Sequence, residues 1–175
     1  MIYVCKYGTY DPEQPRISRL VSVLSEAGYD IRWVVSEGET KDNVISLNTK
    51  SKRNYIRKAA TLLRMVTTPK DIIYGYMHVG ATPAYIASRF SGAKFAYDYA
   101  DPWRGWYFYK TKADSVLWAT GRRAFYLLEK AIYKATDAVF SASYSQLEFL
   151  ERQHGKKRSA NQYAETIFNC PPLKI

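Results

Sequence analysis

The sequence predicts an α/β protein with a mainly parallel sheet of about seven strands and helices on both faces. Short apolar segments alternate along the 175 residues with segments whose apolar side chains recur at helical spacing. Strands separated by helices pair in parallel, and such sheets are covered on both sides. The composition, 47% apolar and 24% charged, is that of a folded globular protein. The pattern is that of a Rossmann-like, doubly wound domain.

The first half of the chain alternates strand and helix signals. Residues 16–27 carry apolar side chains on one helical face, and Gly28 stands where a glycine commonly ends a helix. Residues 83–90 indicate a helix that begins with Pro83, a residue tolerated in a first turn. The other expected elements are strands at 1–6, 30–36, 44–47, 71–76 and 94–98 and a helix at 54–66.

The second half continues this alternation. Ser145 and Glu148 match the Ser-x-x-Glu capping box, which predicts a helix over 147–154. The other expected elements are a long aromatic loop at 99–112, a helix that ends near residue 135, and strands at 137–141 and 163–168.

Composition also excludes several classes of protein. No stretch approaches the roughly 18 apolar residues of a spanning helix. Met1 leads directly into a strand signal without a signal-peptide pattern, so we expect a cytoplasmic protein that at most lies peripherally on the membrane. Cys5 and Cys170 are too few for a disulfide framework or a zinc site, and we expect neither metal nor cofactor.

The loop after the first strand is a candidate binding site, because doubly wound sheets bind ligands beyond the carboxyl ends of their strands. It holds one glycine and therefore lacks the dinucleotide fingerprint. Gly8, between Tyr7 and Thr9, would let backbone approach a ligand, and Arg16 would set a cation at a helix N-terminus for an anion. An ordinary solvated loop is the alternative.

His78 follows the fourth strand in a run of small residues, 77–82, which we expect to be a loop at the crevice. An imidazole can accept a proton near neutral pH, so His78 is a candidate catalytic residue. A histidine that only completes the core is the alternative. His154 we expect to be a favourable charge at a helix C-terminus.

Two carboxylates leave the fifth strand, and aromatic residues follow. Asp98 and Asp101 can accept hydrogen bonds from a hydroxylated ligand, Trp103 offers an apolar face to a sugar or acyl group, and Arg104 follows it. We take Asp101 as the second candidate catalytic residue and the other three as ligand-binding. The alternative is that Asp101 caps a turn before Pro102.

The net charge of +10 is concentrated on one expected helix and around the aromatic loop. At 100° per residue, Arg53, Arg57 and Arg64 fall within about 40° of one another, opposite an apolar arc. Further residues that fit the same kind of surface are Trp106, Arg122 and Arg123. This distribution favours a membrane surface over nucleic acid. An ordinary surface helix whose apolar arc faces the core is the alternative.

Several segments, taken in order, are similar to the N-terminal half of family 4 glycosyltransferases with the GT-B fold. The resemblance covers nearly the whole chain and rests on order and spacing. The segments are Asp11-Pro12 with Pro15-Arg16-Ile17-Ser18-Arg19-Leu20 and 24–31, Asp71-Ile72-Ile73-Tyr74 to His78, Asp98-Tyr99-Ala100-Asp101-Pro102-Trp103, Leu128-Glu129-Lys130, 137–143, and Ile167-Phe168-Asn169.

The resemblance implies half of a two-domain enzyme, with a domain at 1–168 and the start of an interdomain linker at 169–175. It implies a retaining transfer of sugar in glycan or glycolipid assembly. The nucleotide sugar would bind to a C-terminal domain that lies outside the chain, so the chain alone is expected to be inactive. By the same resemblance, His78 and Asp101 would face the acceptor and Ser143 would lie at the cleft rim. The first loop of the family often carries paired glycines, whereas this sequence has only Gly8 there.

Other classes stay open at this point. The net charge suggests an anionic or lipid-linked acceptor if the chain is half a glycosyltransferase. A non-catalytic basic α/β module that binds nucleic acid or a partner protein is the second hypothesis, since cations with aromatics suit single strands. A flavodoxin-like or epimerase-like protein is the third, and tight binding of a free nucleotide would indicate it.

Overall fold

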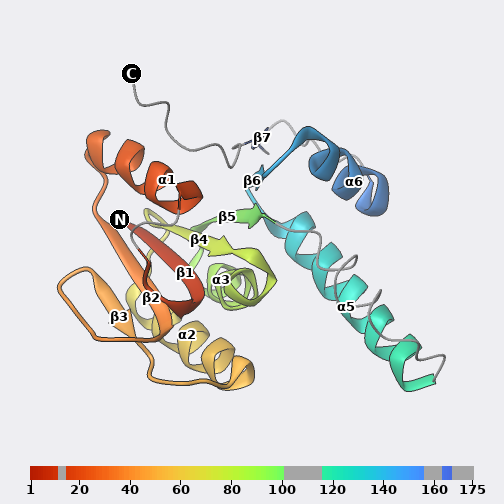
Figure 1. The fold of residues 1–175 in the computed structure, drawn as a ribbon, viewed down its shortest axis with the longest axis horizontal. Helices are drawn as coiled ribbons and strands as arrows, with labels where there is room; N and C mark the ends of the chain where they lie inside the picture. The colour runs from red at the N-terminus through yellow and green to blue at the C-terminus, as the bar shows by residue number, and fades with distance from the viewer. Residues whose placement is uncertain (12–14, 101–115, 156–162, 167–175) are drawn as a thin grey trace.

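The computed structural model describes residues 1–11, 15–100, 116–155 and 163–166, which form seven strands and five helices (Figure 1). The strands are β1 (Ile2–Thr9), β2 (Ile31–Glu37), β3 (Val44–Ser46), β4 (Ile72–Tyr76), β5 (Lys94–Tyr99), β6 (Ala138–Ser141) and β7 (Tyr163–Thr166). The helices are α1 (Pro15–Glu26), α2 (Lys52–Val66), α3 (Met77–Ser91), α5 (Val116–Ala135) and α6 (Tyr144–His154).

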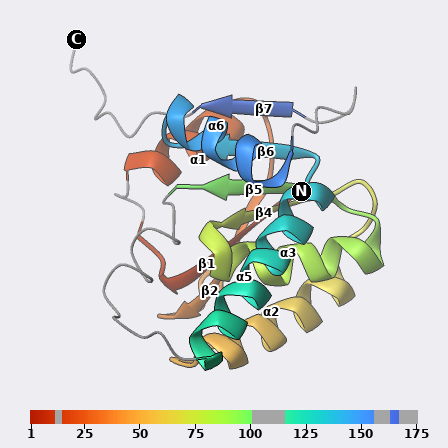
Figure 2. The ribbon, with the colours of Figure 1, turned by 90° about the vertical axis from the view of Figure 1, so that its right-hand side faces the viewer.

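The seven strands form one sheet in the order β3-β2-β1-β4-β5-β6-β7, and all neighbouring strands pair in parallel. Figure 2 shows this stack from β7 down to β2. Ile2 of β1 is aligned with Ile31 on one side and with Ile72 on the other. The order reverses between β1 and β4, as in Rossmann-like sheets. The predicted fold class is confirmed, with a sheet that is wholly parallel.

The helices divide unequally between the two faces of the sheet (Figure 1). On one face Ile17 of α1 packs in a cluster with Val4 and Trp33. On the other face Leu63 of α2 belongs to a cluster that also contains residues of α3, α5 and α6 and the β5 residue Tyr97. Crossovers between parallel strands are right-handed, so once the chain passes from β3 back across β1 to β4 its later helices lie on the second face.

Two glycines let α3 lie directly on the sheet. A Cβ atom on Gly80 would stand 2.2 Å from the carbonyl oxygen of Cys5 in β1, and one on Gly75 would stand 2.4 Å from the Cα atom of Ala81. Both neighbours are backbone atoms, which do not move aside as a side chain would. Close contact between α3 and the two central strands therefore requires glycine at both positions.

Two details of the local prediction are wrong. Helix α3 begins at Met77, so Pro83 lies inside the helix, and residues 77–82 are its first turns where we expected a loop. Helix α6 is capped by Ser143, whose hydroxyl accepts from the Gln146 N–H, and it begins earlier than the expected box at Ser145. The pattern Ser-x-x-Gln at Ser143 is also a capping box, and its amide reaches back to the Ala142 N–H at 3.0 Å.

We predict that Gly80→Ala lowers the free energy of unfolding by about 1–3 kcal/mol, because the added methyl group overpacks α3 against β1. Gly121→Ala is the matched control, since its added Cβ meets nothing within 4 Å and the residue lies in a helix. That change should stabilise the protein by about 0.5–1 kcal/mol. Urea unfolding measures both, and equal effects of the two substitutions would contradict the close packing of α3.

Candidate functional site

The strand order reverses at the switch point between β1 and β4, and doubly wound sheets bind ligands beyond the carboxyl edge at such a point. Strand β1 continues past β4 to Thr9, which is exposed and pairs with Glu37 of β2. Gly8 has φ 113, in the left-handed region that favours glycine, and its N–H donates to the Ser36 hydroxyl at 2.9 Å. The Tyr7 hydroxyl donates to the Lys50 carbonyl. These hydrogen bonds fix residues 7–9, which stay partly accessible and which we call the rim.

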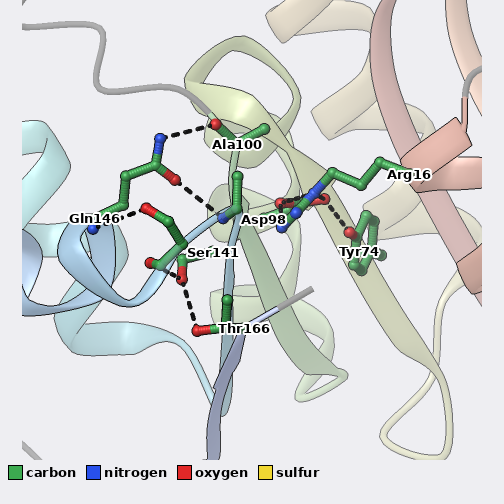
Figure 3. A network of polar contacts seen from close by, with 9 residues as sticks. Arg16, Tyr74, Asp98, Ala100, Ser141, Gln146 and Thr166 are labelled. Carbon is green, nitrogen blue, oxygen red and sulfur yellow. Dashed lines mark hydrogen bonds and ion pairs between the residues drawn. The ribbon is translucent and has the colours of Figure 1, made fainter. Parts of the chain in front are cut away.

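A buried ion pair joins α1 to β5. The guanidinium of Arg16, in the first turn of α1, donates from Nε to both carboxylate oxygens of Asp98 at 3.0 Å and from Nη2 to Oδ1 at 2.6 Å. Arg16 is 4% exposed and Asp98 is fully buried. The Tyr74 hydroxyl of β4 also donates to Asp98 (Figure 3). These contacts tie α1 to β4 and β5 at the carboxyl edge.

The protonation states of this network follow from burial and charge. Burial alone would lower the pKa of Arg16, but its hydrogen bonds to Asp98 and the carboxylate charge outweigh burial, and the pKa is raised. Burial and the charge of Asp98 raise the pKa of Tyr74 well above its ordinary value. Arg16 is thus a cation, and Tyr74 is a neutral donor. Arg16 and Tyr74 therefore both donate hydrogen bonds to the Asp98 carboxylate.

We predict that Asp98→Asn lowers the free energy of unfolding by about 3–5 kcal/mol, because it leaves the buried Arg16 cation without a counter-charge. Tyr74→Phe removes one hydrogen bond to a charged group and should cost about 1.5–3 kcal/mol. Urea unfolding gives both values. The double variant Arg16→Met with Asp98→Leu should lose less stability than the summed losses of Arg16→Met alone and Asp98→Leu alone. Additive costs in that double variant would argue against a direct pair.

A second buried network joins three helices. The carboxylate of Glu129 in α5 lies between two histidines, 2.8 Å from His78 Nε2 of α3 and 2.9 Å from His154 Nε2 of α6. All three side chains are buried. The ring of His78 also contacts Phe125 at a centroid distance of 4.9 Å. His78 is therefore part of a structural cross-link at the start of α3, and His154 belongs to the same cross-link.

The two histidines hold Glu129 in its charged form. Burial by itself would raise the pKa of Glu129, but hydrogen bonds from His154 and His78 outweigh burial and lower the pKa from 4.5 to about 2. A carboxyl group whose pKa falls on folding stabilises the folded state above its unfolded pKa. That contribution is lost as the pH falls through the folded pKa.

We therefore predict that Glu129→Gln destabilises the protein most at pH 5 and above, by about 3 kcal/mol more than at pH 2, given the size of the shift. The difference between wild type and variant should narrow steadily as the pH falls from 5 towards 2. Urea unfolding at several pH values between 2 and 7 measures it. A pH-independent difference would contradict the lowered pKa.

The carboxyl ends of β5, β6 and β7 carry a third set of polar contacts (Figure 3). The Gln146 side chain donates to the Ala100 carbonyl at 3.3 Å and accepts from the Ala142 N–H. The Ser141 hydroxyl donates to the Ser143 carbonyl at 2.9 Å and lies 3.4 Å from Thr166 Oγ1. Ser143 thus stands at the edge as the cap of α6, half-buried.

The structure brings some expected site residues together and separates others. Arg16 and Asp98 pair with each other, whereas His78 joins Glu129. Tyr7, Gly8, Thr9 and Ser143 stay at the accessible edge. Asp101, Trp103, Arg104 and Trp106, together with the linker at 169–175, lie outside the described residues.

Sequence reasoning missed Tyr74, Glu129 and His154 as members of these networks. One signal was present for Glu129, because it lies four residues after Phe125 and three before Ile132 and so shares their buried helical face. A charge on the apolar side of a helix indicates a buried partner. Nothing comparable marks Tyr74, whose partner Asp98 is 24 residues away.

The residues expected at a membrane surface are exposed wherever they are described. Arg53, Arg57 and Arg64 lie on α2, and Arg122 and Arg123 lie on α5. The opposite side of α2 is buried in the core, so the core accounts for its apolar arc. Over the described ranges, no helix is long and apolar enough to cross a bilayer. The same residues contain no group of three or more acidic, histidine or cysteine side chains suited to a metal.

Comparison with known proteins leaves the family open. No protein-family model matches the sequence. No curated protein matches it either. What stands is a Rossmann-like α/β domain with a parallel sheet of seven strands.

Proposed function

We propose that this chain is the acceptor-binding domain of a two-domain glycosyltransferase that takes its sugar from a nucleotide sugar. One observation supports the proposal: two of the segments that resemble the N-terminal half of GT-B enzymes, residues 71–78 and 137–143, contain the carboxyl ends of β4 and β6, and β4 borders the β1–β4 switch point at this carboxyl edge of the sheet. Ligands of doubly wound sheets bind at that place. The reaction we propose is a retaining transfer in glycan or glycolipid assembly.

We assign roles to the residues of the carboxyl edge by whether each is accessible or buried. Residues 7–9 and Ser143 are accessible or half-buried at the carboxyl edge and would contact the acceptor. The Arg16–Asp98 pair and the His78–Glu129 contact are buried and would hold this edge rigid, so His78 acts as a positioning residue. Transfer depends on aligning acceptor and donor and on stabilising the leaving diphosphate. This chain would supply the acceptor's alignment, and the net charge of +10 suits an anionic acceptor.

We predict that the isolated chain binds acceptor lipids without binding the donor. In two-dimensional NMR, a short-chain prenyl phosphate and its sugar-linked form should shift the amides of residues 7–9 and 143, whereas UDP-glucose and GDP-mannose at the same concentration should not. Thr9→Tyr places a bulky ring on the rim and should weaken binding at least tenfold. Ser25→Tyr, an exposed position on α1, is the matched control and should leave binding unchanged.

Two outcomes would overturn this function. Tight binding of a free nucleotide at the same edge would assign the chain to nucleotide-dependent α/β proteins of another kind. Repeated sugar transfer by the 175-residue chain alone would show that it needs no donor domain.

A further inference from the structure

We propose that the outer side of α2 docks on an anionic lipid bilayer, and that the groove between α2 and the end of β3 receives a phospholipid head group. This inference does not depend on sugar transfer. Its observations come from a different surface, and its experiment measures vesicle binding without any donor or acceptor.

The outer side of α2 is cationic along its whole length. The helix carries five Lys or Arg residues and no acidic residue, and the sequence has no Asp or Glu between Asn43 and Lys70. Arg53, Arg57 and Arg64 are exposed, and no ion pair joins them to any other described residue. At 1.5 Å per residue this row is about 16 Å long. A straight row of cations complements a flat anionic surface.

The groove beside this row combines the three kinds of group that a phospholipid requires. It has a volume of about 470 Å³, with Arg57 and Lys58 as cations and Thr61 and Ser46 as hydroxyls, of which Ser46 also donates to Asn48 Oδ1 at 3.1 Å. Lys58 Nζ donates to the Leu47 carbonyl at 3.0 Å, which holds the ammonium at the groove. Leu47, Leu62 and Met65 supply apolar lining. The cations suit the phosphate, the hydroxyls suit the glycerol, and the apolar lining suits the start of an acyl chain.

Two exposed apolar side chains favour a bilayer over nucleic acid. Met65 is 79% exposed and Phe90, from the neighbouring α3, is 67% exposed. The guanidinium of Arg64 lies 4.0 Å from the centre of the Phe90 ring and covers one ring face. The cation leaves only the other ring face for a base, whereas an exposed methionine and an aromatic ring beside cations both suit the bilayer interface. The cations and the apolar groups of this surface thus point to one partner.

Vesicle sedimentation tests the proposal. The chain should bind vesicles of 70% phosphatidylcholine and 30% phosphatidylglycerol and fail to bind pure phosphatidylcholine. Each cation at an anionic surface strengthens binding about fivefold, so Arg57→Gln with Lys58→Gln should weaken it about 25-fold. Lys134→Gln with Arg152→Gln removes the same charge from exposed positions on α5 and α6 and should change binding less than twofold. Circular dichroism checks that both double variants fold.

A second measurement locates the contact. Anionic vesicles should protect Lys58 from acetylation by a water-soluble reagent, read by mass spectrometry, while Lys134 stays reactive. Equal losses in the two double variants, equal binding to neutral vesicles, or an unprotected Lys58 would overturn the proposal. So would displacement by 5 mM inorganic phosphate at constant ionic strength, which would mark a site for free anions. Tighter binding to single-stranded DNA, lost in the groove variant, would assign the surface to nucleic acid.

Discussion

A buried carboxylate is stable only when hydrogen-bond donors or a positive charge contact it. Two buried carboxylates, Asp98 and Glu129, determine how the helices of this domain are connected. Asp98 brings Arg16 from the first helix and Tyr74 from a central strand to the carboxyl edge of β5. Glu129 brings together α3 and α6 through one histidine from each. Asp98 therefore ties α1 to the sheet on one face, and Glu129 ties three helices to one another on the other face.

This arrangement changes how the candidate site is understood. Arg16 and Asp98, which were expected to contact a ligand, pair with each other instead. Residues 7–9 at the switch point and Ser143 at the end of β6 stay accessible or half-buried, and they offer backbone groups and hydroxyls. Neutral donors and acceptors on a rigid base suit a hydroxylated ligand, since their geometry is set before the ligand arrives. The charge that would attract an anionic lipid lies elsewhere, on the outer side of α2.

Periodicity was enough to predict the fold class and all seven strands of the described residues, because each of those signals lies within a few adjacent residues. The start of α3 was missed because Gly80 and Pro83 are poor helix formers, and packing on β1 overrides that preference. The cap of α6 was misplaced because two overlapping patterns, at Ser143 and Ser145, satisfy the same rule. The Arg16–Asp98 pair joins residues 82 positions apart, a distance over which no local pattern reports.

The strand order also has a consequence for how the chain folds. β1 lies inside the sheet beside the central strand β4, yet β4 begins 70 residues later in the chain, so the pairing of Ile2 with Ile72 closes a very long loop. Contacts of such high sequence separation form slowly, because loop entropy is lost before the contact is gained. During synthesis β1 and β2 can pair while the opposite edge of β1 is still bare. That edge stays open to wrong partners until Ile72 arrives.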